Sequence, residues 1–283
     1  MSQLSDFAEQ GLLNHIVRGV ALSFPATWYV AFHTAAVAED GSGAEVNPAH
    51  WLNYARPSIA RTSAGWNQAQ AAPGGGRSAD NANLLNLGNA QIVQAVSITH
   101  WSLRDAATGG NSWWSGALTT PRLVQDGNPV SIAAGALDII LRGAFSDFAA
   151  AALLDYILAG AALTFPTNWA VQLLTTNPTA ADIGTEISTS DWPNYARVSI
   201  ARSAGAWSAA ATEGGGGYRV ANAADVDFDT ASIVTPVTPL YRGLRNAGGG
   251  QELWFHTQLT STDQVVDTND VVYEPGMIAV GLR

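Results

Sequence analysis

The chain has 283 residues, of which 47% are hydrophobic and only 13% are charged, a balance that allows packed cores and excludes a disordered chain. Its net charge of −10 argues against a nucleic-acid-binding protein, because that function needs a basic face. The sequence has no cysteine, which excludes disulfides, thiolate chemistry and zinc sites with sulfur ligands.

The first residues predict neither a signal peptide nor a membrane anchor. They are polar and acidic, without a basic start before an apolar run. The longest apolar run, near residues 148–165, is interrupted by Asp155 and Gly160 and falls short of the roughly 18 unbroken apolar residues of a membrane span. We therefore expect a soluble protein, made in a cytoplasm, that has no membrane contact.

Residues 5–19 predict a helix. Ser5 suits the N-cap position, and Asp6 and Glu9 in the first turn suit the positive end of the helix dipole. Apolar residues then follow at helical spacing, and Gly19 can end the helix. The same logic recurs at residues 146–160.

After the helix, the sequence takes on the short period of β-strands. Residues 28–34 predict a strand rich in aromatic residues, and residues 56–62 predict another, with Pro57 at its start or on a sheet edge. Further strands are predicted at 84–87, 93–104, 112–118, 130–133 and 137–141. This pattern is typical of a mainly β fold, a β-sandwich with an N-terminal helix packed on it.

The sequence repeats itself at an offset of 141 residues. Residues 53–61 align with residues 194–202, and eight of these nine positions are identical. Without a gap, the same offset pairs four tryptophans, Trp28, Trp51, Trp66 and Trp113, with Trp169, Trp192, Trp207 and Trp254. A fixed offset of this length indicates a duplicated domain rather than a solenoid, whose repeats span about 20–50 residues.

We therefore expect two domains of the same fold, residues 1–143 and residues 144–283. No Gly/Ser or Pro linker separates them, which predicts close packing. Each copy has the length of a domain that can fold alone. Their surfaces differ, because residues 1–141 carry 6 Arg and 9 acids (net −3) and residues 142–283 carry 7 Arg and 14 acids (net −7).

The sequence shows no catalytic, cofactor or metal site. None of the five histidines, His15, His33, His50, His100 and His256, recurs in the other copy, and no two have the spacing of metal ligands. No G-x-S-x-G elbow supports a serine hydrolase. The glycine runs at 74–76 and 214–217 lack the Lys-Ser/Thr of a P-loop, so we interpret them as flexible loops that can contact a partner.

Two acidic positions recur, Glu45 with Glu186 and Asp126 with Asp267. Such residues form a glycosidase pair only where the carboxyl groups lie roughly 5–9.5 Å apart. The favoured alternative is that Glu45 is solvated or pairs with a repeated arginine, which is Arg56, Arg61 or Arg104. Arg56 and Arg197 are predicted to be framework residues, each held by an acid and backbone carbonyls.

The ten tryptophans raise the question of sugar binding through exposed rings. The four that recur in both copies are predicted to lie in the shared core, because the surfaces have diverged around them. Trp101 and Trp114 do not recur, which makes them better candidates for a contact specific to the first copy, although ordinary packing is the favoured role for both.

Several segments together resemble a known family. They are residues 25–35 (PATWYVAFHTA), Glu45, residues 54–56 (YAR), residues 105–111 (DAATGGN), residues 116–121 (GALTTP) and residues 135–141 (GALDIIL). They are similar to small virion proteins of tailed phages, commonly labelled tail-fibre or capsid-decoration (cement) proteins. The resemblance covers the whole first copy, and the second copy departs from it at residues 172–174 and 246–248. It implies a structural virion protein with no catalytic residues.

Within this class we expect a capsid decoration protein that binds the major capsid protein and stabilises the shell. The alternative is a tail-fibre or tail-tip protein that contacts tail proteins or the host surface, and a glycan-cleaving enzyme is the third possibility. The absence of the heptads or long β-repeats of a trimeric stem favours decoration. We expect a monomer that acts as a pseudo-dimer, with contacts from loops that differ between the copies, residues 36–47 and 177–188.

Overall fold

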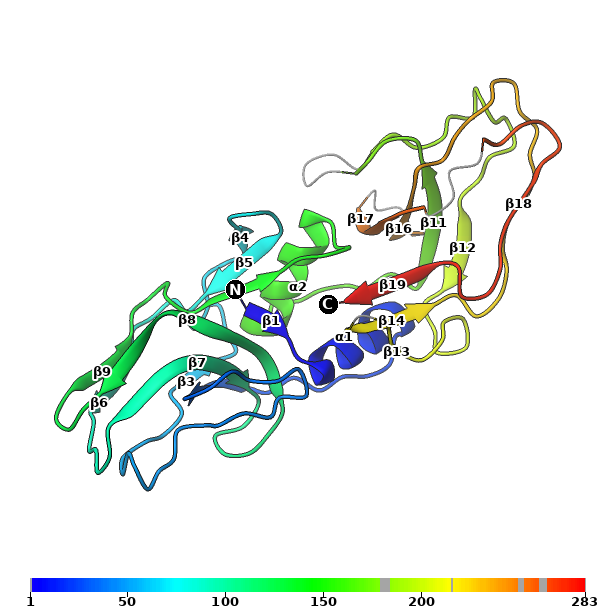
Figure 1. Cartoon of the computed structure of the whole chain (residues 1–283). Coiled ribbons are helices and arrows are strands. Elements are labelled where there is room, and N and C mark those ends of the chain that lie inside the picture. The colour runs from blue at the N-terminus through cyan, green and yellow to red at the C-terminus, as the bar shows by residue number, and fades with distance from the viewer. Residues whose placement is uncertain (1, 179–183, 215, 249–251, 260–263, 283) are drawn as a thin grey trace.

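The computed structural model describes residues 2–178, 184–214, 216–248, 252–259 and 264–282 (Figure 1). The described chain is mainly β, with two helices of equal length, α1 (Asp6–Arg18) and α2 (Asp147–Ala159). The predicted fold class is confirmed, since each of two tandem β-sandwich-like repeats begins with a helix. No helix in the described ranges is long and apolar enough to cross a membrane.

Both helices begin and end at the predicted residues. The Oγ of Ser5 accepts a hydrogen bond from the N–H of Ala8 at 3.3 Å, and the Oγ of Ser146 accepts one from Ala149 at 3.1 Å. The helices end at Gly19 and Gly160, whose φ angles are 70° and 68°. Glycine suits both ends because a Cβ is strained in this left-handed conformation.

In the first half, a five-stranded antiparallel sheet has the order β1-β8-β7-β2-β3, a small sheet has the order β10-β5-β4, and β6 and β9 form a ribbon. The strands are β1 (Ser2–Leu4), β2 (Thr27–His33), β3 (Ser58–Ala60), β4 (Gln70–Ala71), β5 (Arg77–Asp80), β6 (Leu85–Asn89), β7 (Val96–Arg104), β8 (Ser112–Val124), β9 (Pro129–Ile132) and β10 (Asp138–Leu141).

The second half repeats this strand order, which confirms that the two copies share one fold. Its sheets are β12-β11-β16-β17 and β13-β14-β19, with the ribbon β15-β18. A single bridge between Phe145 and Phe255 stands where Leu4 of β1 pairs with Trp114 of β8. The strands are β11 (Asn168–Leu174), β12 (Val198–Ala201), β13 (Ala211–Thr212), β14 (Tyr218–Ala221), β15 (Val226–Thr230), β16 (Tyr241–Asn246), β17 (Leu253–Gln258), β18 (Asp270–Tyr273) and β19 (Ala279–Leu282).

One hairpin differs in its pairing between the halves. In the first half, β7 and β8 stay paired from Arg104 out to Val96. In the second half, the β16–β17 ladder runs from Tyr241 to Arg245, and a bridge between Val237 and Val265 stands where Val96 pairs with Val124. Between these two stretches Pro239 replaces Ile98, and proline has no N–H to donate to a ladder.

The helices are exchanged between the halves. α1 packs on β14 and β19 of the second half as well as on β8 of its own half, and α2 packs on β5 of the first half as well as on β17. Figure 1 shows both helices in the middle of the molecule, between the two sets of sheets. Each helix packs on its own sandwich, as expected, and each small sheet is also covered by the helix of the other copy.

A single hydrophobic core runs through both halves. The four repeated tryptophans and their four equivalents lie in it and are at most 2% exposed, which confirms their predicted core role. Trp28 meets Trp113 edge to face at 5.2 Å, and Trp169 meets Trp254 at 5.5 Å. A core shared in this way argues against the expectation that each copy folds alone.

Cutting the connection between the halves tests this sharing. If a protease site is inserted after the exposed Gly143, we expect the cleaved halves to elute together at the volume of the intact chain, because each helix stays buried in the other half. Size-exclusion chromatography before and after cleavage measures this, and denaturant should be needed to separate the fragments. Two half-size particles in native buffer would contradict the expectation.

Candidate functional site: the interface between the halves

The centre of the interface lies where two equivalent residues meet. His15 of α1 and Tyr156 of α2 occupy the same position of the repeat, 141 residues apart. The Nε2 of His15 lies 3.2 Å from the Oη of Tyr156, and the rings stack at 6.0 Å with an angle of 4° between their planes. Equivalent positions meet in this way only on a two-fold axis, so the halves are related as in an isologous dimer.

Two arginines bind the ends of the exchanged helices. Arg61 donates from Nε to the carbonyl of Ile157 at 2.8 Å and from Nη2 to that of Tyr156 at 2.5 Å. Arg202 binds Ile16 and His15 in the same way, at 2.7 Å and 2.5 Å. A cation suits these sites because the last carbonyls of a helix carry the negative end of its dipole.

Further contacts repeat across the same axis. The carbonyl oxygen of the Asn14 side chain accepts the N–H of Ala210 at 3.2 Å, and its equivalent, Asp155, accepts the N–H of Ala69 at 2.9 Å. Phe24 packs on Tyr156 at 5.2 Å, and its equivalent Phe165 packs on His15 at 5.2 Å. Each half thus supplies the same contacts to the other.

Away from the interface, each half contains the same triad of a glutamate, a tyrosine and an arginine. In the first half, Arg56 forms a bidentate ion pair with Glu45 at 2.8 and 2.6 Å, and the Oη of Tyr54 donates to Glu45 at 3.1 Å. Arg56 also donates to the carbonyls of Ala106 and Gly109, at 2.7 and 2.8 Å. Of the three possible partners of Glu45, the structure selects Arg56, and the predicted framework role is confirmed.

The second half repeats this triad with Glu186, Tyr195 and Arg197. The ion pair has the same lengths, 2.8 and 2.6 Å, and Tyr195 donates to Glu186 at 3.1 Å. Burial raises the pKa of Tyr195, so its phenol stays a neutral donor. The acids therefore fix the backbone around them rather than a substrate.

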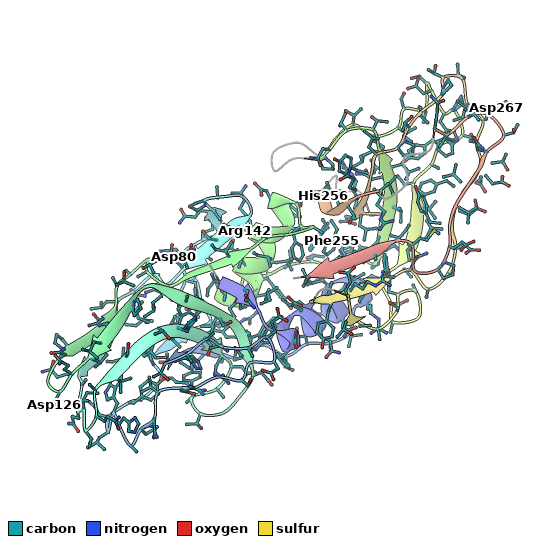
Figure 2. All side chains as sticks on the ribbon, viewed as in Figure 1. Asp80, Asp126, Arg142, Phe255, His256 and Asp267 are labelled. Atoms are coloured by element: carbon teal, nitrogen blue, oxygen red, sulfur yellow. The ribbon has the colours of Figure 1, made fainter. Side chains whose placement is uncertain are left out.

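The recurring aspartates have a separate structural role. Asp126 accepts the N–H of Ile92 at 2.9 Å, and Asp267 accepts that of Ile233 at 3.0 Å. Figure 2 shows Asp126 and Asp267 at opposite ends of the molecule. Since Glu45 is held in its ion pair with Arg56, the glycosidase hypothesis gains no support from the structure.

The unrepeated histidines and tryptophans are placed in packing roles. His33 is fully buried, with Nε2 2.8 Å from the Oγ of Ser102, and burial lowers its pKa to about 4. Trp101 and Trp114 are 8% and 0% exposed, which agrees with the favoured packing role and leaves little of either ring to contact a partner. In the described part of the chain, no three His, Asp or Glu side chains gather closely enough to hold a metal ion.

The loops singled out in the sequence are partly held by the fold. Residues 74–76 form the turn between β4 and β5, where the carbonyl of Gly75 accepts from Arg142 at 2.9 Å. In the loop at residues 36–47, the carbonyl of Glu39 accepts the N–H of Asp6 at 2.8 Å. Residue 215 of the second glycine run and residues 179–183 of the loop at 177–188 lie outside the described residues.

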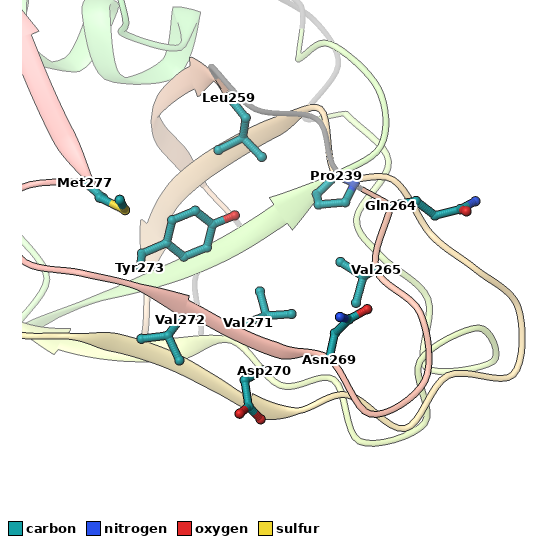
Figure 3. Close-up of a pocket in the computed structure, with 10 residues that line it drawn as sticks. All are labelled: Pro239, Leu259, Gln264, Val265, Asn269, Asp270, Val271, Val272, Tyr273 and Met277. Atoms are coloured by element: carbon teal, nitrogen blue, oxygen red, sulfur yellow. The ribbon is translucent and has the colours of Figure 1, made fainter.

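A pocket opens in the second half beside β18 (Figure 3). Leu259, Val265, Val271 and Tyr273 line it together with the polar Gln264, Asn269 and Asp270, and Pro239 stands at its edge. The carboxylate of Asp270 accepts a hydrogen bond from the hydroxyl of Thr230 at 2.6 Å. Among the described lining residues, Asp270 is the one acid, and none is a histidine, serine or cysteine.

The triads and the recurring aspartates of the described residues support the backbone of a β-rich tandem repeat. Comparison with protein families specifies the class: the family described as Podophage GP4 fiber I protein gp80 matches residues 3–140 and again residues 144–281. The chain therefore belongs to this family of phage fibre proteins, in two copies joined in tandem. No curated protein matches the chain.

Proposed function

We propose that this chain is a non-enzymatic structural component of a podophage tail fibre. The observation that carries the proposal is the match of a fibre-protein family to both halves. The sequence has no heptad stem, which on its own favours capsid decoration over a fibre. The chain nevertheless matches a family described as a fibre protein, so the missing stem no longer favours decoration.

The shape of the molecule supports this role. The same turn of the repeat, marked by Asp126 and Asp267, stands at each of the two opposite ends (Figure 2). The interface in the middle is tied by repeated hydrogen bonds, as at Arg61 and Arg202. A stiff body with two ends can hold two neighbouring virion proteins at a set distance from one another.

The two ends of the molecule carry different charges, which supports the view that each end contacts a different neighbouring protein. Around the end of the second half lie five acids, Asp191, Asp227, Asp229, Asp267 and Asp270, whereas the equivalent positions of the first half hold one acid, Asp126. We propose tail proteins or a host surface as the partners. The major capsid protein is the partner in the competing decoration role.

Labelled and deleted particles test the proposal. With a gold-labelled tag on this chain, we expect the label on the tail in electron micrographs, and we expect particles that lack the chain to keep their genome at low salt but to adsorb poorly. Wild-type particles and deleted particles complemented with the chain are the controls. Label over the shell, with genome loss at low salt, would assign the chain to capsid decoration instead.

A further inference from the structure

The two helix contacts are equivalent in fold but differ in charge. Where α2 meets β5, Asp147 forms an ion pair with Arg77 at 3.0 Å. Where α1 meets β14, the equivalent positions hold Asp6 and Tyr218, so the acid is kept and the cation is gone. The contact of α1 therefore lacks the ion pair that holds its counterpart.

The same contact has gained a buried acid. Glu9 of α1 stands where α2 has Ala150, and the two side chains are 4% and 1% exposed. The Oε2 of Glu9 is buried and has no hydrogen-bond partner. A carboxylate with an unpaired oxygen is costly to bury, whereas a protonated carboxyl is much less so.

The charged groups around Glu9 are also acidic. Asp6 lies on its own helix, and Glu39 comes from the loop at residues 36–47 and reaches the turn before β14, where a Cβ on Gly216 would lie 3.9 Å from its carboxylate. Burial raises the pKa of Glu9 to about 7, and both neighbouring acids add to the shift.

Nothing basic faces Glu9 from the other packed elements in the described ranges. On β14, Tyr218 is the neighbouring side chain, and Arg219 points to the opposite face of the strand, beside Gly281 and Glu213. The described strand β19 (Ala279–Leu282) carries no charged residue, and neither do residues 112–117 of β8.

We propose that the contact between α1 and the small sheet of the second half is a pH-sensitive latch, which closes when Glu9 takes up a proton. The contact between α2 and β5 is held by an ion pair and stays closed over the same range. The molecule thus has one variable and one fixed joint between its halves.

The direction of the pH dependence follows from the linkage between proton binding by Glu9 and closing of the latch. The pKa of Glu9 is higher in the closed latch than its ordinary value of 4.5 in the open one. The closed state therefore binds more protons, so this stabilisation is full below about pH 4.5 and is lost as the pH rises to about 7. Since each pKa unit is a factor of ten, the opening equilibrium of α1 should rise by roughly 100-fold across this window.

Hydrogen exchange on the full chain tests the latch, because α2 provides an internal control. After correction for intrinsic exchange rates, we expect protection of α1 and β14 to fall by one to two orders of magnitude from pH 5 to pH 8, with α2 and β5 unchanged. Equal pH dependence at both helices would overturn the proposal.

Four variants separate the latch from a general effect of pH. Glu9→Gln and Glu9→Ala should hold α1 protected at both pH values, and Glu274→Gln, which changes an exposed acid, should behave as the wild type. Tyr218→Arg should also keep α1 protected at pH 8, because it restores the cation of the other contact. A pH dependence that persists in both Glu9 variants would refute the latch.

Discussion

Replacing Arg61 and Arg202 together by alanine is expected to lower the free energy of unfolding by about 4–6 kcal/mol. Each guanidinium makes two hydrogen bonds to helix carbonyls across the interface, and a hydrogen bond to a charged group contributes a net of about 1.5–3 kcal/mol; the lower end applies here, because water can reach these half-buried side chains when the arginine is removed. Each guanidinium also lies over a phenylalanine ring, that of Arg61 over Phe24 at 5.0 Å and that of Arg202 over Phe165 at 4.6 Å. Urea unfolding followed by tryptophan fluorescence measures the loss.

A matched control is Arg122→Ala. Arg122 also donates to two carbonyls, those of Ser131 and Pro129, but it is exposed and lies away from the interface. Its removal should cost less than about 1 kcal/mol, as is usual for surface positions. If the double variant unfolds at the same urea concentration as Arg122→Ala, the arginines do not hold the halves together.

The second large loss of stability is expected at the triad of the first half, which consists of Glu45, Tyr54 and Arg56. Arg56→Ala should cost about 3–5 kcal/mol, because it leaves the carboxylate of Glu45 without its cation and two carbonyls without their donor. The side chain of Arg56 is 5% exposed, whereas that of its equivalent, Arg197, is 32% exposed. Arg197→Ala should therefore cost only about 1–2 kcal/mol, since water can reach the freed groups.

The two variants serve as controls for each other in one denaturant series. They remove the same ion pair from the same fold, so a difference between them reports burial. An Arg56→Ala protein as stable as the wild type would show that Arg56 is not a framework residue. A larger loss for Arg197→Ala would contradict the part of the argument that rests on exposure.

The sequence predicted the features that depend on local order or on repetition. The helix ends at Ser5 and Gly19 follow from the chemistry of caps, and the core tryptophans follow from their recurrence around diverged surfaces. For the strand order, the sequence predicts only that it is the same in both halves. These inferences need no knowledge of which element lies beside which.

The exchange of the helices could not be predicted in this way. An apolar face shows that a helix is covered, but either copy of the small sheet fits it equally well, because the copies are homologous. Nothing in the sequence indicates that His15 and Tyr156 meet, because the two residues differ in type and therefore do not appear as a repeated pair. The recurrence of Arg61 and Arg202 was visible, but it does not distinguish contacts within a half from contacts across the axis.

Trp101 and Trp114 show why lack of recurrence is a weak sign of surface contact. Trp101 lies over Gly116, where a Cβ would come within 3.0 Å of the indole ring. In the first half the indole ring of Trp101 fills this space, whereas the second half fills the equivalent space with other side chains. Divergence between copies therefore marks repacked core as well as changed surface.

The exchange of the helices also determines how the molecule carries tension. A pull on its two ends, at Asp126 and Asp267, acts across a joint in which both helices are anchored in opposite directions. To part the halves, the hydrogen bonds of Arg61 and of Arg202 must both break. At low pH, where the latch of α1 is closed, the two joints share the load and a single abrupt rupture is expected, whereas at pH 8 the joint of α1 is expected to yield before that of α2.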